Sequence, residues 1–284
     1  KRRTYTLAEE LGIPVPKTYY ITSHAELESL LNNKEEKLSF PMFMKPESDS
    51  KGFLHKYGIK GVVCENKEEL LKYYQNYDAF GGQLILQDMI PGEEGKHMNL
   101  RVVLNRQSQP LGVFFSSRRR SSQQFQSPTI VGSTWSDTVL DYSLQLLSKI
   151  GYYGFAALMF KLDPRDGQFK LIEINGRITM SNSLPLKCGV NLPYLMYQEA
   201  LHGPLLGLEN PKQNYPDNVL WWFLAEDIAS VIRHKTFLKP LECIKCMIGS
   251  GYVVEPMYWR DPYPGIRSVI GMCLMGLKKI SRKG

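Results

Sequence analysis

The chain of 284 residues contains no apolar run approaching the roughly 20 residues needed to cross a bilayer, which argues against a membrane-spanning protein. No signal peptide is recognisable. Because the sequence opens on Lys1 rather than Met, we expect that it was cut from a longer protein, so this lack decides little. The five cysteines are unevenly spaced, which predicts reduced thiols and a cytoplasmic protein rather than a disulfide framework.

Several motifs that would indicate other chemistry are also missing. Cys243 and Cys246 form a lone C-x-x-C without a second ligand pair for zinc, and they are better read as two half-buried helix cysteines. No G-x-S-x-G and no Cys–His pair points to a nucleophilic hydrolase. No nucleic-acid recognition motif accompanies the net charge of +7, so we expect no nucleic-acid partner.

The positive charge instead favours anionic small molecules, such as nucleotides or phosphorylated and carboxylated substrates. It is concentrated at Arg118–Arg120 and in a basic tail over residues 278–283. The segment from Ile266 onward is apolar with this basic end. Two interpretations stay open for it: a docking helix, or an amphipathic helix peripheral to the inner, anionic membrane surface.

The most informative segment covers residues 155–177 and reads FAALMFKLDPRDGQFKLIEINGR. Turn residues at 163–167 predict two strands joined by a tight turn. Alternation along a strand places Glu173, Asn175 and Arg177 on the same side. A carboxylate, an amide oxygen and a guanidinium suit a magnesium-bound polyphosphate. The alternative interpretation is the polar outer face of an edge hairpin.

Other patterns predict the surrounding elements. Capping boxes at Ser23–Glu26 and Asn66–Glu69 predict helix starts, and Ser136 or Asp137 starts a helix that runs to residue 150. A buried strand over residues 40–46 contains a single lysine, Lys45, which would be costly there unless it were paired. We further expect a short helix over residues 3–11, and strands over residues 18–21, 59–63, 100–104 and 111–115. Residues 84–92 predict an apolar strand that runs into a Pro-Gly turn.

The hairpin and the segment after it resemble the signature of the ATP-grasp superfamily, and within it the carboxylate–amine ligases. That signature has a D-P-R-D-G turn, then L-x-E-I-N-x-R, a Ser four residues past the Arg, and A/C-G-V-x-x-P. This chain has Ser181, Cys188-Gly189-Val190 and Pro193 at those spacings. The resemblance implies an α+β, ATP-grasp fold in which two α+β subdomains grip ATP. The family's usual N-terminal domain is expected to be missing here.

The resemblance covers roughly residues 1–205 and implies four segments. Connecting helices occupy residues 1–38, and the lid subdomain occupies residues 39–88. The central subdomain with the metal site extends over residues 89–205. A mostly helical extension, with Trp221–Leu224 and Asp227 leading a helical region, occupies residues 206–284.

The same resemblance assigns the nucleotide contacts. Lys45 would contact the α and β phosphates, and the loop over residues 47–58 would close over the triphosphate. Lys60 is the candidate for a second phosphate lysine, in competition with Lys51 and Lys56. The remaining expected contacts are the adenine segment Gln87, Asp88, Met89 and Ile90, the ribose acid Glu93 or Glu94, and Arg101 near phosphate or substrate carboxylate.

For catalysis the resemblance implies Mg²⁺ on Glu173 and Asn175, with Arg177, Lys60 and one arginine of Arg118–Arg120 around the phosphates. Arg120 is preferred among the three. A small-molecule carboxylate would attack ATP to form an acyl phosphate, which a small-molecule amine would convert to an amide. The sequence names neither the carboxylate nor the amine.

One position departs from the family pattern. The first strand of the hairpin usually carries a metal-binding acid two residues before a Lys, where this chain has Met159. Two hypotheses result. The first is an ATP-dependent carboxylate–amine ligase with a modified metal site, and the second is a nucleotide-binding module that does not catalyse ligation.

Overall fold

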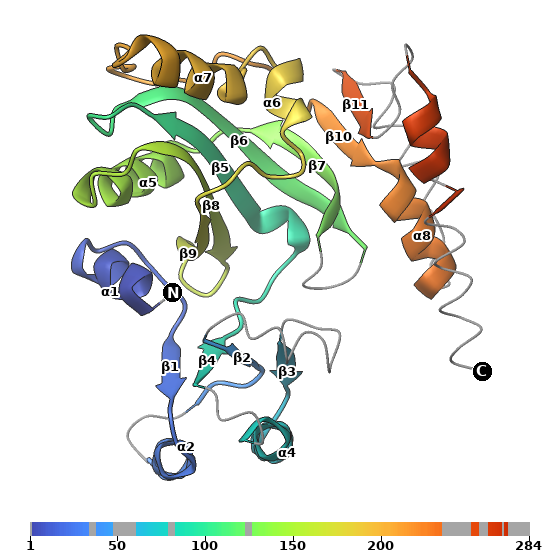
Figure 1. Cartoon of the computed structure of the whole chain (residues 1–284). Coiled ribbons are helices and arrows are strands. Elements are labelled where there is room, and N and C mark those ends of the chain that lie inside the picture. Colours follow the sequence, from blue (N-terminus) through green and yellow to red (C-terminus); the bar gives the residue numbers. More distant parts are fainter. Residues whose placement is uncertain are drawn as a thin grey trace. The chain divides into compact units, whose positions relative to one another are not determined.

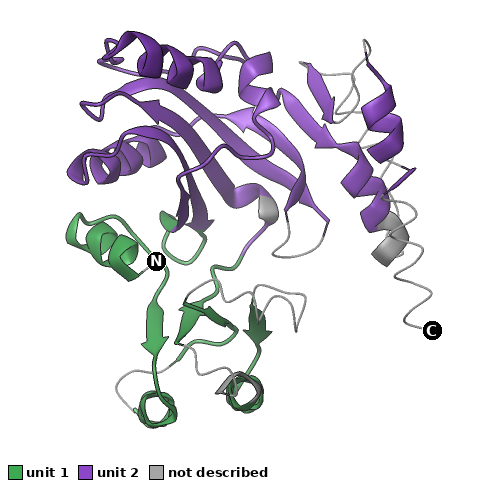
Figure 2. Ribbon diagram, viewed as in Figure 1, with its two compact units in different colours: residues 1–91, 163–171 green, residues 92–162, 172–284 purple. Residues whose placement is uncertain are grey.

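The protein is seen in a computed structural model that describes residues 2–33, 38–47, 61–78, 83–122, 127–234, 251–255, 261–268 and 270–271. Its contacts divide the chain into two compact units (Figure 2). Unit 1 comprises residues 1–91 and 163–171, and unit 2 comprises residues 92–162 and 172–284. In the described residues no helix has the length and apolar character needed to cross a membrane.

The chain contains both helices and strands, and several strands follow one another directly (Figure 1). The labelled helices of the described residues are α1 (Arg2–Glu10), α2 (His24–Asn32), α4 (Lys67–Asp78), α5 (Asp137–Lys149), α6 (Ser183–Lys187), α7 (Leu192–His202) and α8 (Leu224–His234), with the 3-10 turn η1 (Glu94–Lys96). The strands are β1 (Thr18–Ile21), β2 (Met42–Pro46), β3 (Val62–Cys64), β4 (Leu84–Asp88), β5 (His97–Leu104), β6 (Pro110–Ser121), β7 (Pro128–Thr134), β8 (Gly154–Asp163), β9 (Gln168–Asn175), β10 (Leu220–Phe223) and β11 (Tyr252–Glu255).

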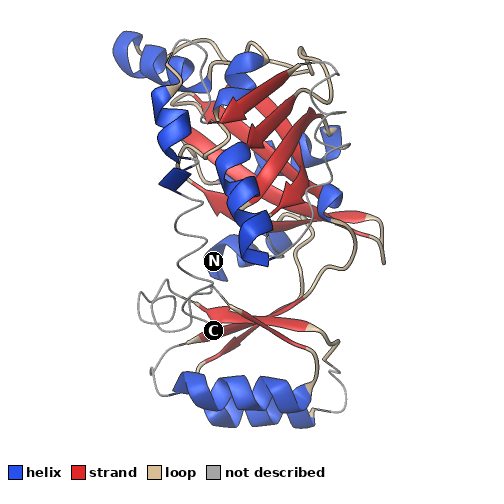
Figure 3. Cartoon of the chain, turned by 90° about the vertical axis from the view of Figure 1, so that its right-hand side faces the viewer, coloured by secondary structure: helices blue, strands red, loops and turns tan. Residues whose placement is uncertain are grey.

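Unit 1 is built on an antiparallel sheet of four strands in the order β1-β4-β2-β3. Helices α2 and α4 lie side by side against one face of this sheet (Figure 3). Their apolar side chains, among them Leu27 and Leu70, pack with Met42, Met44 and Leu86 of the strands to form the core of the unit.

The helix starts of unit 1 agree with the predicted caps. The Ser23 hydroxyl accepts a hydrogen bond from the Glu26 backbone N–H at 3.2 Å. The Asn66 side chain accepts from the Glu69 N–H at 2.9 Å. Both bonds satisfy N–H groups that the first turn of a helix would otherwise leave without partners, so the predicted starts are confirmed.

Unit 2 is built on a sheet of seven strands in the order β11-β10-β7-β6-β5-β8-β9. Helix α5 covers one face, and α6 and α7 cover the other (Figure 1). The Ser136 hydroxyl accepts from the Val139 N–H at 3.3 Å at the start of α5, and Gly151 comes after the helix with φ +61°. The predicted helix is therefore confirmed at both ends.

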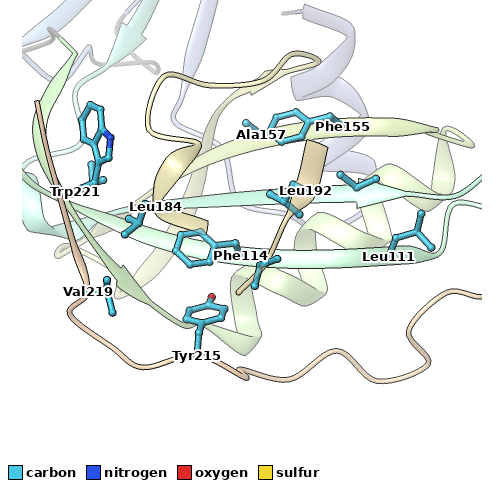
Figure 4. Packing of buried hydrophobic residues seen from close by; sticks show 12 residues of the cluster. Leu111, Phe114, Phe155, Ala157, Leu184, Leu192, Tyr215, Val219 and Trp221 are labelled. Carbon is cyan, nitrogen blue, oxygen red and sulfur yellow. The ribbon is translucent and has the colours of Figure 1, made fainter. Parts of the chain in front are cut away.

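The face of the large sheet below α6 and α7 holds a buried cluster (Figure 4). Phe114 and Trp221, both completely buried, come from strands β6 and β10. Leu184 and Leu192 come from α6 and α7, and Tyr215 packs its ring on Phe114 with centroids 4.6 Å apart. This core holds α6, α7 and the segment before β10 against the sheet.

The predicted hairpin is confirmed, since β8 and β9 are neighbouring strands. Gly167 takes φ +71°, a conformation that costs glycine little, and its N–H donates to the Asp163 carbonyl at 2.8 Å. By its contacts, the hairpin turn (residues 163–171) belongs to unit 1. At the end of this segment the Leu171 N–H donates a hydrogen bond to the Pro14 carbonyl at 2.8 Å.

Two segments differ from the sequence prediction. Strand β6 continues to Ser121, so Arg118–Arg120 lie within a strand paired with β7, whereas the predicted strand ended at residue 115. Residues 220–223 form β10 rather than the head of a helical region, because they pair with β7 on one side and β11 on the other. Helix α8 begins only at Leu224.

Candidate functional site

Glu173 and Asn175 lie on the second half of β9, and both are half-buried. The Asn175 amide Nδ2 donates to Glu173 Oε1 at 3.0 Å, so the two side chains share one face of the strand as predicted. Because Nδ2 is the donor in this bond, Asn175 Oδ1 is the atom that offers lone pairs. Arg177 comes just after the strand and is exposed.

This pair fits Mg²⁺ without forming a complete cage. The described residues contain no group of three or more His, Cys, Asp or Glu side chains that could hold a metal ion. Magnesium is commonly bound by one or two carboxylates, with water and substrate phosphate completing its octahedron. Glu173 and Asn175 Oδ1 are oxygen donors of this kind. Met159 is half-buried on β8 and pairs in register with Asn99.

In unit 1 the predicted phosphate lysine and the predicted adenine segment meet. Lys45 Nζ donates to Gln87 Oε1 at 3.0 Å across strands β2 and β4. Gln87 is buried, and its Nε2 donates to the Tyr5 hydroxyl at 3.0 Å and to Thr18 Oγ1 at 2.9 Å. These two bonds orient the amide, which presents its oxygen to Lys45.

The predicted adenine segment leaves β4 at Asp88. The Asp88 N–H donates to the Lys17 carbonyl at 2.9 Å, and Ile90 is buried two residues further on. Burial raises the pKa of the Asp88 carboxyl above its ordinary value, against the opposing effect of Arg165 and Lys17. Met89 is half-buried beside it.

The predicted ribose acids lie on the other side of Pro91. Glu93 is exposed and lies in unit 2, and Glu94 begins η1. Lys60, the predicted second phosphate lysine, lies outside the described residues. The same holds for its competitors Lys51 and Lys56, for most of the predicted closing loop, for Cys243 and Cys246, and for the basic tail.

The hairpin turn carries its own charge cluster. Arg165 Nη2 lies 2.6 Å and Lys170 Nζ 2.7 Å from the buried Asp163 carboxylate. The Arg165 hydrogen bonds, and then the hydrogen bond from Lys170, hold the pKa of Asp163 well below its usual range. This cluster fixes the turn that precedes β9, and thereby the strand that carries Glu173.

Arg101 on β5 is a buried cation held by hydroxyl groups. Its Nε donates to Thr179 Oγ1 at 2.7 Å and its Nη1 to Ser116 Oγ at 3.0 Å, while Nη2 donates to Ser181 Oγ. No ion pair with a described acid is found for it. Burial lowers the pKa of Arg101 to about 10, so the guanidinium stays charged at neutral pH. Arg101 thus ties the segment after Arg177 to the central strands.

The three arginines of β6 have different surroundings. Arg118 is buried, and the exposed Arg119 donates from Nη2 to Asn218 Oδ1 at 2.7 Å. Arg120 lies with Nε 3.1 Å from Oδ1 of Asp227 on α8. Asp227 was not predicted as a site residue, because nothing in its local sequence indicates which strand α8 approaches.

Most of the chain matches a known family of ATP-binding domains. Residues 1–205 match the family described as "Carbamoyl-phosphate synthase L chain, ATP binding domain". This match covers more than half of the chain, so the chain belongs to that family. The predicted resemblance to ATP-grasp carboxylate–amine ligases and the predicted α+β, ATP-grasp fold are confirmed.

Two curated relatives are similar in sequence. D-aspartate ligase of Enterococcus faecium (strain Aus0004) is 28% identical over 201 residues, which are 66% of this chain and 46% of that protein. The arginine-specific carbamoyl phosphate synthase large chain of Geobacillus stearothermophilus is 26% identical over 222 residues, 74% of this chain and 20% of that protein. The chain therefore spans half or less of the length of these relatives.

Solved structures show the same fold. An L-amino acid ligase from Bacillus licheniformis superposes with a TM-score of 0.57 at 19% identity, over 76% of this chain and 52% of that one. The ADP complex of PurK, N5-carboxyaminoimidazole ribonucleotide synthetase, has a TM-score of 0.56 at 17% identity over 72% and 52% of the two chains.

Proposed function

We propose that the protein is an ATP-dependent ligase that joins a small-molecule carboxylate to an amine through an acyl phosphate, releasing ADP and phosphate. The observation that carries the proposal is the hydrogen-bonded Glu173–Asn175 pair on the strand that leads to Arg177. Membership of an ATP-binding family and similarity to D-aspartate ligase support it.

The proposed reaction has two steps with balanced atoms. A carboxylate oxygen of the first substrate attacks the γ-phosphorus of ATP, the bond from that phosphorus to the bridging oxygen breaks, and ADP leaves. The amine nitrogen of the second substrate then attacks the acyl carbon. Inorganic phosphate leaves with the electron pair of the broken bond, and the nitrogen loses a proton to become an amide.

In this proposal four described side chains contact ATP or its metal ion, and Gln87 orients one of them. Lys45, oriented by Gln87, contributes a positive charge to the phosphates from unit 1. In unit 2, Arg177 contributes a guanidinium fork suited to phosphate or carboxylate oxygens. Glu173 and Asn175 would hold Mg²⁺, which when bound neutralises charge that develops on the transferring phosphoryl group.

A second candidate function is nucleotide binding without ligation. It is favoured by Met159, an apolar side chain on the strand next to the one that carries Glu173. With one carboxylate in the pair, metal affinity is expected to be weaker than with two. This candidate predicts that ATP binds but that no substrate pair accelerates ADP release, and that Met159→Glu strengthens magnesium binding.

The deciding experiment measures ADP release by the full-length protein across pairs of amino acids, with D-aspartate included because a relative is named for it. If the protein is a ligase, we expect ADP release only when a carboxylate and an amine are present together. Glu173→Ala is expected to abolish it, whereas Glu209→Ala, at an exposed acid outside the site, is expected to leave it unchanged. Nucleotide binding without release by any pair would favour the second candidate, and no binding would refute both.

A further inference from the structure

The contact between Arg120 and Asp227 joins the central sheet to a helix beyond the matched family segment. Arg120 Nε lies 3.1 Å from Asp227 Oδ1. The Asp227 side chain is fully buried, while 21% of the Arg120 side chain is exposed. The other Asp227 oxygen, Oδ2, accepts a hydrogen bond from Trp222 Nε1 at 3.1 Å. The family match ends at residue 205, so Asp227 lies outside it.

The surrounding structure fixes this contact. Strand β10 pairs with β7, and β7 pairs with β6, where Arg120 stands opposite Ile130. Helix α8 begins directly after β10. The Ser230 hydroxyl on α8 donates to the Ser122 carbonyl at 2.7 Å, close to the end of β6. Backbone pairing of β10 and the Ser230–Ser122 hydrogen bond therefore hold α8, and with it the Asp227 carboxylate, beside Arg120.

The buried charge of Asp227 favours keeping the Arg120 guanidinium next to it. A carboxylate completely removed from water is unfavourable unless a cation lies close by. Arg120 is the cation that the structure places against Oδ1, and this is an ion pair without an aligned hydrogen bond. If the guanidinium turned away, a buried charge would be left uncompensated.

The contact uses only one side of the guanidinium. Asp227 faces Nε, and within the described part of the chain neither terminal nitrogen of Arg120 makes a hydrogen bond. Nη1 and Nη2 together carry four N–H donors in a planar fork, a geometry that matches the oxygens of a phosphate group. Since the side chain is partly exposed, these donors are accessible to a ligand.

We infer that Asp227 is a positioning residue: it holds the Nε side of Arg120 so that the terminal nitrogens bind the terminal phosphate of ATP. The inference rests on the proposed function for its ligand and adds to it a residue from the C-terminal part of the chain. The group that Arg120 would bind is the γ-phosphate, which a nucleoside triphosphate has and a diphosphate lacks.

The test compares affinities of the full-length protein for ADP and for a non-hydrolysable ATP analogue by calorimetry with magnesium. Asp227→Asn keeps the size of the side chain and an oxygen for Trp222 but removes the charge. The expected result is a roughly tenfold loss of affinity for the analogue, with ADP affinity within about twofold, because one charge-assisted contact is misplaced. Asp141→Asn, an exposed acid on α5, is the matched control.

A double variant shows whether the effect acts through Arg120. Arg120→Met alone would leave Asp227 buried without its cation and would endanger folding, so Arg120→Met is combined with Asp227→Asn. We expect the double variant to bind the analogue no more than about threefold more weakly than Asp227→Asn, since that substitution already removes most of the Arg120 contribution. Asp227→Glu should recover part of the discrimination between the two nucleotides.

Three outcomes contradict the inference. If Asp227→Asn keeps the wild-type ratio of the two affinities while the double variant loses it, Arg120 binds phosphate without help from Asp227. If all three proteins show the same ratio, the ion pair serves only to dock α8. If the wild-type protein binds neither nucleotide, the proposed function fails together with the inference.

Discussion

Substitution of Gln87 tests whether this side chain orients Lys45 for binding phosphate. Only 5% of Gln87 is exposed, and the side chain makes hydrogen bonds with Lys45, Tyr5 and Thr18. Gln87→Leu removes all of these bonds but nearly conserves volume, so the consequence comes from lost polar contacts rather than from a cavity.

The stability lost in Gln87→Leu depends on the three partners of the amide. Each neutral hydrogen bond, to Tyr5 and to Thr18, contributes about 0.5–1.5 kcal/mol to stability. The Lys45 bond involves a charge, but Lys45 is half-buried and water can replace part of the contact. We therefore expect the free energy of unfolding to fall by about 2–3 kcal/mol. We also expect ATP affinity to fall roughly fivefold, because the Lys45 ammonium loses the acceptor that orders it.

The assay pairs urea unfolding with nucleotide titration. Gln75→Leu, at an exposed position of α4 in the same unit, is the control and should change neither quantity appreciably. Gln87→Glu separates the two roles, since a carboxylate accepts from Lys45 but cannot donate to the hydroxyl groups. The reasoning is refuted if Gln87→Leu is as stable as wild type and binds ATP equally well.

Two further predictions concern stability. The Asp163 pKa is lowered in the folded state, mainly by Arg165, so its contribution is present above the unfolded pKa of about 4 and is lost as the pH falls below that value. Asp163→Asn should therefore unfold more easily at pH 7 and lose less stability on acidification, as measured by thermal melts from pH 7 to pH 3; equal slopes would contradict this. Tyr215→Phe removes the hydroxyl that accepts from the buried Phe115 N–H at 2.7 Å and should cost about 1–3 kcal/mol in urea unfolding, and a change within error would show that water replaces it.

Local sequence was sufficient for features that depend on near neighbours. Capping at Ser23 and Asn66 involves a side chain and an N–H three residues away, so the motif already contains both partners. Glu173 and Asn175 lie on the same face because side chains alternate with a period of two residues along a strand, and the hydrogen bond between them confirms this placement. The turn before them could be predicted because Gly167 adopts a positive φ at little cost.

Partners far apart along the chain could not be predicted in this way. Tyr5 and Gln87 are separated by 82 residues, and Arg101 and Ser181 by 80. Their contacts depend on which strands become neighbours, and that order results from burying apolar faces across the whole sheet. Arg101 was predicted near phosphate or substrate carboxylate; its three bonds in the structure are to the hydroxyl groups of Thr179, Ser116 and Ser181, of which only Ser181 belongs to the family signature.

By itself, the sequence determined the family signature, the helix caps and the polar face of the hairpin, because each depends on spacing within a few residues. Tertiary structure alone decided that the β6 arginines lie in a strand and that Asp227 approaches Arg120. An arginine run has no apolar alternation to indicate a strand, and only pairing with β7 supplies the hydrogen bonds that keep it extended. Likewise, a buried carboxylate finds its cation through the packing of a distant helix, which no local pattern records.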